Sequence, residues 1–264
     1  RPEAYLTEIT TASQRQELLR EAGVDEIITL AYSLEFAKQS PHDFVVNHLV
    51  NELHAAVVVE GEDVRFGANN AGDARTLEQL GAQLGFDVVI VNDLTDAKTG
   101  RRWSSTWVRE ALLAGDVAEA ARILGRPHRI RGIVEHGVKR GRELGFPTAN
   151  VHAEGIGVAP ADGVYAGWLY CPVEGRLPAA ISVGTNPHFA GERRTVEAHV
   201  LSRADLDLYH TQVDVAFIDR IRPMRSFASL EALLSAMDDD LVHTSAVLGV
   251  APAQRVNPAD VTAH

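Results

Sequence analysis

Residues 137–150 read GVKRGRELGFPTAN, a stretch in which glycines and cations lead into a Pro-Thr-Ala-Asn turn. Three glycines within nine residues let backbone N–H groups approach an anion closely. Thr148 and Asn150 add neutral oxygens of the kind that bind a hard cation. The stretch therefore predicts a phosphate site. The cations it offers are Lys139, Arg140 and Arg142.

The nearest alternative for this stretch is a P-loop, because Gly132 and Gly137 have the G-x-x-x-x-G spacing. Val138 stands where a P-loop has its lysine, and the residues up to Pro147 are not expected to open a helix. The P-loop is therefore excluded. Ordinary turn glycines, a solvated cationic face and a side-chain turn after Pro147 stay open as other interpretations.

Length and composition bound the class of protein. At about 150 residues per domain, 264 residues predict two domains. A net charge of -11 argues against a nucleic-acid-binding surface and favours a small anionic ligand for the basic loop. Cys171 is the single cysteine, so no intrachain disulfide forms, and neither a signal peptide nor an apolar run of about 20 residues occurs. We expect a cytoplasmic protein without membrane partners; a homo-oligomer is compatible with the sequence.

The first half of the chain alternates apolar runs with helical patterns, which favours a parallel sheet covered by helices. Glycines after the helical patterns and an aspartate before the last one supply the expected ends. The predicted helices cover residues 13–22, 41–53, 77–84, 106–114 and 117–124, and the predicted strands cover residues 26–30, 55–59 and 87–91.

The second half changes character after Pro127. Short strand-like segments bounded by glycine and proline are typical of an all-β barrel or sandwich. A helix is expected over residues 229–248, and the segment from Gly249 is expected to be disordered. The predicted strands cover residues 128–134, 164–170, 179–183, 195–201 and 213–218.

Residues 137–150 resemble the glycine-basic loop and Pro-Thr-Ala-Asn motif of the riboflavin kinase module in bacterial bifunctional FAD synthetases. Three later segments resemble that family's motifs in the same order: AISVGTNP at 180–187, RTVEAH at 194–199 and RPMRSF at 222–227. Four ordered motifs over roughly a hundred residues are specific. The resemblance implies a six-stranded Greek-key barrel with a C-terminal helix, which phosphorylates riboflavin to FMN with ATP and Mg²⁺.

The resemblance also implies roles for single residues. Glu197 would accept the proton of the ribityl hydroxyl, while Thr148 and Asn150 would hold Mg²⁺. On composition alone, Glu197 reads as a solvated strand carboxylate and Phe227 as a core residue. The implied nucleotide-binding residues are Gly137, Lys139, Gly141, Arg142, Phe146, Thr148 and Asn150, and the implied flavin-binding residues are Arg222, Phe227, Leu230 and Glu231.

Two segments of the first half resemble an FMN adenylyltransferase module with a Rossmann-like nucleotidyltransferase fold. WSSTWVR at 103–109 would place hydroxyls and an arginine at a helix N-terminus, a good phosphate site, although an isolated cluster of this kind is more often a helix cap. VEGEDVRFG at 59–67 resembles the flavin-side loop. The candidate residues are Asp63, Arg65, Phe66, Ser104, Ser105, Thr106 and Arg109.

The family's adenylyltransferase module also has a first strand and a G-x-F-D-G-x-H-x-G-H motif, which this sequence does not contain. We therefore predict an N-terminally incomplete module over residues 1–126, a kinase domain over 127–248 and a tail over 249–264. The expected product is FMN and not FAD, although the intact parent protein would make both. The alternative is a non-catalytic flavin- or nucleotide-binding module, which would not need Glu197; an RNA-binding barrel is disfavoured by the acidic charge.

Overall fold

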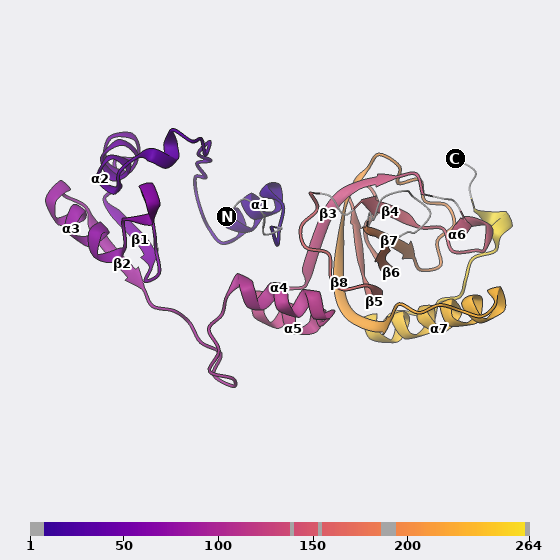
Figure 1. Ribbon diagram of the computed structural model, residues 1–264. Helices are drawn as coiled ribbons and strands as arrows, with labels where there is room; N and C mark the ends of the chain where they lie inside the picture. The colour runs from indigo at the N-terminus through magenta and orange to yellow at the C-terminus, as the bar shows by residue number, and fades with distance from the viewer. Residues whose placement is uncertain (1–7, 138–139, 153–154, 186–193, 262–264) are drawn as a thin grey trace. The chain divides into compact units, whose positions relative to one another are not determined.

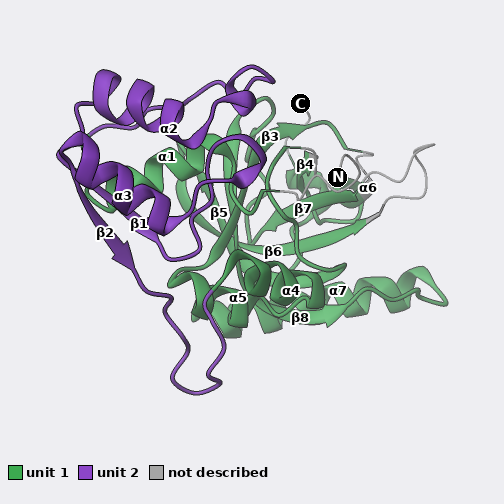
Figure 2. Ribbon diagram, turned by 60° about the vertical axis from the view of Figure 1, so that its left-hand side comes forward, with its two compact units in different colours: residues 1–25, 104–264 green, residues 26–103 purple. Residues whose placement is uncertain are grey.

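The computed structural model describes residues 8–137, 140–152, 155–185 and 194–261. The chain forms two compact units, shown in different colours in Figure 2. One unit combines residues 1–25 with residues 104–264, and the other consists of residues 26–103. Each unit is described by itself.

The unit of residues 26–103 contains a two-stranded parallel sheet, in which β1 (Val57–Gly61) pairs with β2 (Asp87–Val91). A small core is formed by Val45, Leu77, Leu80 and Phe86. The parallel pairing confirms the predicted βα arrangement. The helical elements are α2 (Pro41–Phe44), the π-helix η2 (Val45–Glu52), α3 (Ala74–Leu84) and the short 3₁₀ turns η1 (Phe36–Lys38) and η3 (Ala68–Asn70).

Two strand predictions for this unit need correction. The segment 26–30 forms no strand, because an apolar run becomes a strand only when a neighbouring strand pairs with it. The buried strand predicted at 55–59 begins two residues later, and its Val57 and Val59 are exposed. Val58 packs against the small core, so this sheet has one covered and one uncovered face.

The other unit is built on a closed barrel of six antiparallel strands, which confirms the predicted architecture (Figure 1). Around the barrel the order is β3-β4-β7-β6-β5-β8. Large side chains such as Ile130, Leu169 and Phe217 fill its core. The strands are β3 (His128–Glu135), β4 (Ala149–His152), β5 (Gly163–Cys171), β6 (Gly175–Thr185), β7 (Arg194–Val200) and β8 (Gln212–Pro223).

Helices surround this barrel, and most of them end where the sequence predicts. Gly115, Gly125 and Gly249 adopt left-handed backbone conformations that end the three helices before them. None of the described helices has the length and apolar character to cross a bilayer. The helices are α1 (Ala12–Glu21), α4 (Ser105–Ala114), α5 (Val117–Leu124), the one-turn α6 (Arg140–Glu143), α7 (Leu230–Leu248) and the 3₁₀ turn η4 (Pro258–Asp260).

The compact units do not divide at Pro127. Helices α4 and α5 bury Val108, Leu112 and Val117 in the same core cluster as the barrel strands, so the barrel unit begins at Ser104. Helix α1 belongs to it as well, since the Gln14 side-chain amide donates to the Arg129 carbonyl oxygen over 3.3 Å. The functional limits 1–126 and 127–248 stay a prediction.

Three further expectations differ from the structure. Residues 149–152 form β4, where the Pro-Thr-Ala-Asn motif suggested a turn. The basic loop contains the single turn of α6, where no helix was expected. The segment after Gly249 was expected to be disordered, yet Ala253 is 2% exposed and the Val256 N–H donates to the Gly145 carbonyl oxygen over 3.1 Å. Backbone hydrogen bonds hold this segment in place. Such bonds do not depend on the side chains, so the sequence shows no periodic pattern that would predict the order.

Candidate active site

Glu197 lies in β7, between two neighbouring strands of the barrel wall. Its Cα partners are Asn150 in β4 and Ser182 in β6. Residues paired across antiparallel strands share one face, and successive residues alternate between faces. Because Val196 and Ala198 are buried in the barrel core, Glu197 is on the outer face with Asn150 and Ser182. The fold therefore gathers three polar side chains at one place on the barrel wall.

The Glu197 carboxyl is partly buried, and this determines its proton affinity. Burial raises its pKa above the usual value for glutamate, and a hydrogen bond from Thr148 partly offsets the rise. Desolvation disfavours the charged form, whereas a donor favours it. A carboxylate with a raised pKa is a better proton acceptor than a solvated one. The site thus contains a strengthened base.

Thr148 and Asn150 lie next to this base. The Asn150 side-chain amide donates to both the carbonyl oxygen and the hydroxyl oxygen of Thr148, each over 3.2 Å. A Cβ atom at Gly137 would lie 2.6 Å from the Asn150 amide nitrogen. A side chain at this position would displace the Asn150 amide. The start of the basic loop and the Pro-Thr-Ala-Asn motif are therefore packed together.

The oxygens of Thr148 and Asn150 fit Mg²⁺, which prefers oxygen donors and is usually held by few protein ligands together with substrate phosphates and water. Within the described ranges, no group of three or more His, Cys, Asp and Glu residues gathers to hold a metal ion. An all-protein metal cage is thus missing from the described part, while a site shared with a phosphate is compatible with the neighbouring glycine loop.

A cavity of about 260 Å³ opens beside Glu197. Its wall is mostly apolar and includes a few polar groups, as is usual for sites that bind organic ligands. The cavity is lined by Phe146, Thr148, Val164, Ala180, Ser182, Glu197, His199, Arg222, Met224, Arg225, Phe227, Leu233, Met237, Asp240 and Leu241.

The structure brings two of the four predicted flavin residues to this cavity. Arg222 and Phe227 line it, whereas Leu230 is 50% exposed and Glu231 is exposed at the first turn of α7. The next turns of α7 line the cavity instead, through Leu233, Met237, Asp240 and Leu241. These four residues are spaced so that they lie on one face of the helix. The helical period of the sequence could therefore have identified them as residues that face the cavity.

Arg222 is held rigidly in the cavity wall. Its Nε and Nη2 atoms donate to the two carboxylate oxygens of Asp240 over 2.8 and 2.7 Å. Its guanidinium also lies 5.5 Å from the Phe227 ring centroid. A bidentate pair of this kind fixes geometry as well as charge. It joins β8 to α7 at the edge of the cavity.

His199 is a further member of the site that the sequence did not single out as a site residue. Its Nδ1 lies 2.8 Å from the Pro147 carbonyl oxygen, and its ring packs against Phe146 at 5.4 Å between centroids. Burial lowers its pKa, so the ring is neutral near pH 7. A neutral ring that donates from Nδ1 fixes the backbone immediately before Thr148.

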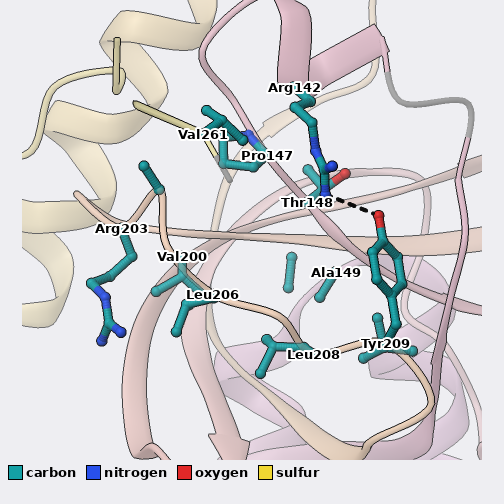
Figure 3. A pocket seen from close by; sticks show the side chains of 13 residues that line it. Arg142, Pro147, Thr148, Ala149, Val200, Arg203, Leu206, Leu208, Tyr209 and Val261 are labelled. Carbon is teal, nitrogen blue, oxygen red and sulfur yellow. Dashed lines mark hydrogen bonds between the residues drawn. The ribbon is translucent and has the colours of Figure 1, made fainter. Parts of the chain in front are cut away.

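Figure 3 shows a second, smaller pocket. Thr148 lines both pockets. Arg142 lines the smaller pocket and donates from Nη2 to the Tyr209 hydroxyl over 3.1 Å. Phe146 is buried and lines the larger cavity, and its predicted contact with the nucleotide stays a prediction. Gly141 supports the loop, since its carbonyl oxygen accepts the Phe146 N–H over 2.8 Å. Lys139 lies outside the described residues.

The candidate adenylyltransferase residues fall into both compact units. Asp63 pairs with Arg102 over 2.6 Å at an exposed position, and Arg65 and Phe66 follow it in the same unit. Ser104 caps α4 by accepting the Trp107 N–H over 3.2 Å, as the simpler interpretation of this cluster predicts. Ser105 and Thr106 are exposed in the first turn of α4, and Arg109 is partly buried one turn later. Their role in adenylyl transfer stays a prediction.

Comparison with known proteins gives consistent results for both parts of the chain. The family described as "Riboflavin kinase" matches residues 124–248, and the family described as "FAD synthetase" matches residues 1–107. The bifunctional riboflavin kinase/FMN adenylyltransferase of Escherichia coli K12 is 37% identical over 88% of this chain and 73% of the relative. The Pseudomonas fluorescens protein of the same name is 38% identical over 90% of this chain and 77% of its own length.

A solved structure described as a macrolide-efflux protein from Streptococcus pneumoniae has a TM-score of 0.77 and 34% identity, and covers 88% of this chain and 73% of that chain. The description of that protein is not transferred to this chain. The similarity supports a shared fold. Both family matches, the two relatives and the ordered motifs on the barrel agree. This chain belongs to the bifunctional riboflavin kinase/FMN adenylyltransferase family.

Proposed function

We propose that the barrel unit transfers the γ-phosphoryl group of ATP to the ribityl 5′-hydroxyl of riboflavin. The hydroxyl oxygen forms the new bond to phosphorus, the bond between the γ-phosphorus and the β-bridging oxygen breaks, and the hydroxyl proton passes to Glu197. The products are FMN and ADP. The observation that carries the proposal is the position of Glu197, a base with a raised pKa in the wall of the cavity next to Thr148.

The two pockets supply one place for each substrate. The larger, apolar cavity would hold the flavin ring, with Arg222 and Phe227 at its edge. The smaller pocket would hold the nucleotide, with Arg142 beside its phosphates. Because Thr148 lines both pockets, the phosphoryl group would cross at this residue. Phosphoryl transfer mainly needs such positioning and charge neutralisation.

Mg²⁺ would be held by the Thr148 and Asn150 side-chain oxygens together with ATP, where it would neutralise negative charge on the phosphates. The protein residues perform the remaining tasks. The loop at Gly137 brings backbone close to Asn150, and His199 fixes the Pro147 carbonyl immediately before Thr148. Glu197 takes the proton.

The adenylyltransferase activity belongs to the part that matches the FAD synthetase family, with Asp63, Arg65, Phe66, Ser104, Ser105, Thr106 and Arg109 as its proposed residues. The histidine motif that the resemblance implies is not in this sequence. A cytoplasmic location, with riboflavin, FMN and ATP as ligands, completes the proposal.

The test is to incubate the chain with riboflavin, ATP and Mg²⁺ and to separate riboflavin, FMN and FAD by chromatography, with an excess of EDTA as the control. We expect FMN, and none when EDTA removes the metal. A folded chain that binds riboflavin but forms no FMN would favour the non-catalytic binding module. Formation of FAD as well would show that the part matching the FAD synthetase family is active.

A further inference from the structure

The segment Gly249–Val261, which we call the C-terminal strap, follows the part of the chain that matches the riboflavin kinase family. It begins where Gly249 ends α7 in a left-handed conformation. In Figure 1 it is the yellow segment that leaves α7 and passes next to α6. Three successive contacts fix its course.

The first contact anchors the strap to α7. The Ala253 N–H donates to the Ser245 hydroxyl oxygen over 3.1 Å, and the Ser245 hydroxyl donates to the Leu241 carbonyl oxygen over 2.8 Å. Ala253 is buried in a cluster with Phe146 and Leu201. A buried residue with a satisfied backbone donor is an ordered part of the fold.

The second contact joins the strap to the end of the basic loop. The Val256 N–H donates to the Gly145 carbonyl oxygen over 3.1 Å. Gly145 has φ +86°, and a Cβ at this position would collide with the Val256 carbonyl oxygen. The strap and the loop therefore approach so closely that only glycine fits. Gly145 also donates its N–H to the Arg142 carbonyl oxygen over 3.2 Å, which extends the connection to Arg142.

The third contact brings the strap to the smaller pocket. Val261 lines this pocket together with Arg142, Pro147 and Thr148, and Figure 3 shows it beside Pro147. Among the described residues that line the larger cavity, none comes from the strap. The strap thus gives a lining residue to one of the two pockets and contacts the loop that leads to it.

We propose that the C-terminal strap is part of the nucleotide site, where it clamps the end of the basic loop at Gly145 and contributes Val261 as an apolar wall, and thereby sets the affinity for the adenine nucleotide but not for riboflavin. This inference rests on the proposed function, since it takes the smaller pocket as the nucleotide pocket. Clamping the loop in advance would reduce the ordering cost of nucleotide binding.

The test uses two truncations of the full chain. Ending the chain after Asn257 removes residues 258–264, including Val261, but keeps Ala253 and the Val256 hydrogen bond. The matched control ends after Val261 and removes only residues 262–264. Dissociation constants for Mg·ADP and for riboflavin are measured by titration calorimetry and by flavin fluorescence. We expect the first truncation to weaken Mg·ADP binding about three- to tenfold while riboflavin binding stays within about twofold, and the control to resemble the full chain.

A second variant, Val256→Pro, removes the N–H that donates to Gly145 and leaves Val261 in the chain. We expect it to weaken Mg·ADP binding in the same direction, with thermal unfolding as the check on folding. Unchanged Mg·ADP affinity in both variants, with FMN formed by the full chain, would overturn the role of the strap alone. Equal losses for both ligands would show a general structural effect and overturn it too. Failure of the full chain to bind Mg·ADP would instead overturn the assignment of the nucleotide pocket.

Discussion

The barrel unit and the unit of residues 26–103 show how differently two sheets can be completed. In the barrel, each strand has two neighbours, and the ring closes between β8 and β3. In the other unit, two parallel strands have one neighbour each, and Val57, Val59, Val89 and Val91 on one face are exposed. Closure of the barrel places Glu197 between two paired strands. The comparison teaches that a closed sheet holds a site residue such as Glu197 from both sides, because each of its strands is hydrogen-bonded to two neighbours.

The largest expected difference between the two units concerns their ion pairs. Replacing Arg222 by alanine leaves the buried Asp240 carboxylate without its bidentate partner, so the free energy of unfolding should fall by about 3 kcal/mol. The matched control is Arg102→Ala in the other unit, where the half-exposed Arg102 pairs with Asp63 and Asp93 and the loss should stay below about 1 kcal/mol. Urea unfolding of both variants measures the contrast. Equal losses would contradict it.

The second prediction concerns how the stability of the barrel depends on pH. His128 in the barrel is buried, and burial lowers its pKa to about 4. Between this value and the unfolded value near 6.5, the unfolded chain binds more protons than the folded one, so stability is present above pH 6.5 and is lost as pH falls towards 4. The loss should reach about 3 kcal/mol.

The measurement for His128 is urea unfolding of the wild type and of His128→Gln at pH 7 and pH 5. Glutamine can still donate to the Val158 carbonyl oxygen, which lies 2.7 Å from Nε2 of His128. The variant should lose less stability between the two pH values than the wild type. If both lose the same amount, His128 does not titrate as described.

The smallest expected effect compares two valines on the two sheets. Val183 in β6 is fully buried, so Val183→Thr should lower the free energy of unfolding by about 1–3 kcal/mol, because the new hydroxyl has no partner. Val59 in β1 is 58% exposed, and Val59→Thr should change the free energy of unfolding by less than about 0.5 kcal/mol. Thermal unfolding measures both. A large loss at Val59 would show that its face is covered in solution.

Much of this fold could be predicted from the sequence, because the signals were local. The strand Asp87–Val91 and the ends of α5 and α7 coincide with the expected limits, since alternation and glycine caps act within a few residues. The prediction of a strand at 26–30 was wrong because a strand also needs a neighbouring strand to pair with. β4 was missed because Pro147 and Thr148 are typical of a turn.

The candidate site could be predicted in part. The motif residues Thr148, Asn150 and Glu197 lie together, yet only the strand register could show this, since residues 149–152 and 194–200 are paired across a long stretch of sequence. Leu230 and Glu231 are exposed and do not line the cavity, and their role in flavin binding stays a prediction. The strap was missed because backbone hydrogen bonds and one buried alanine leave no pattern.

The central claim is that Glu197 accepts the proton from riboflavin. The measurement that tests it most directly is the steady-state rate of FMN formation by Glu197→Gln beside the wild type, with Mg·ADP and riboflavin dissociation constants measured on both. We predict a kcat lower by about 10²- to 10⁴-fold, with both dissociation constants nearly unchanged. A variant that forms FMN at the wild-type rate would contradict the account.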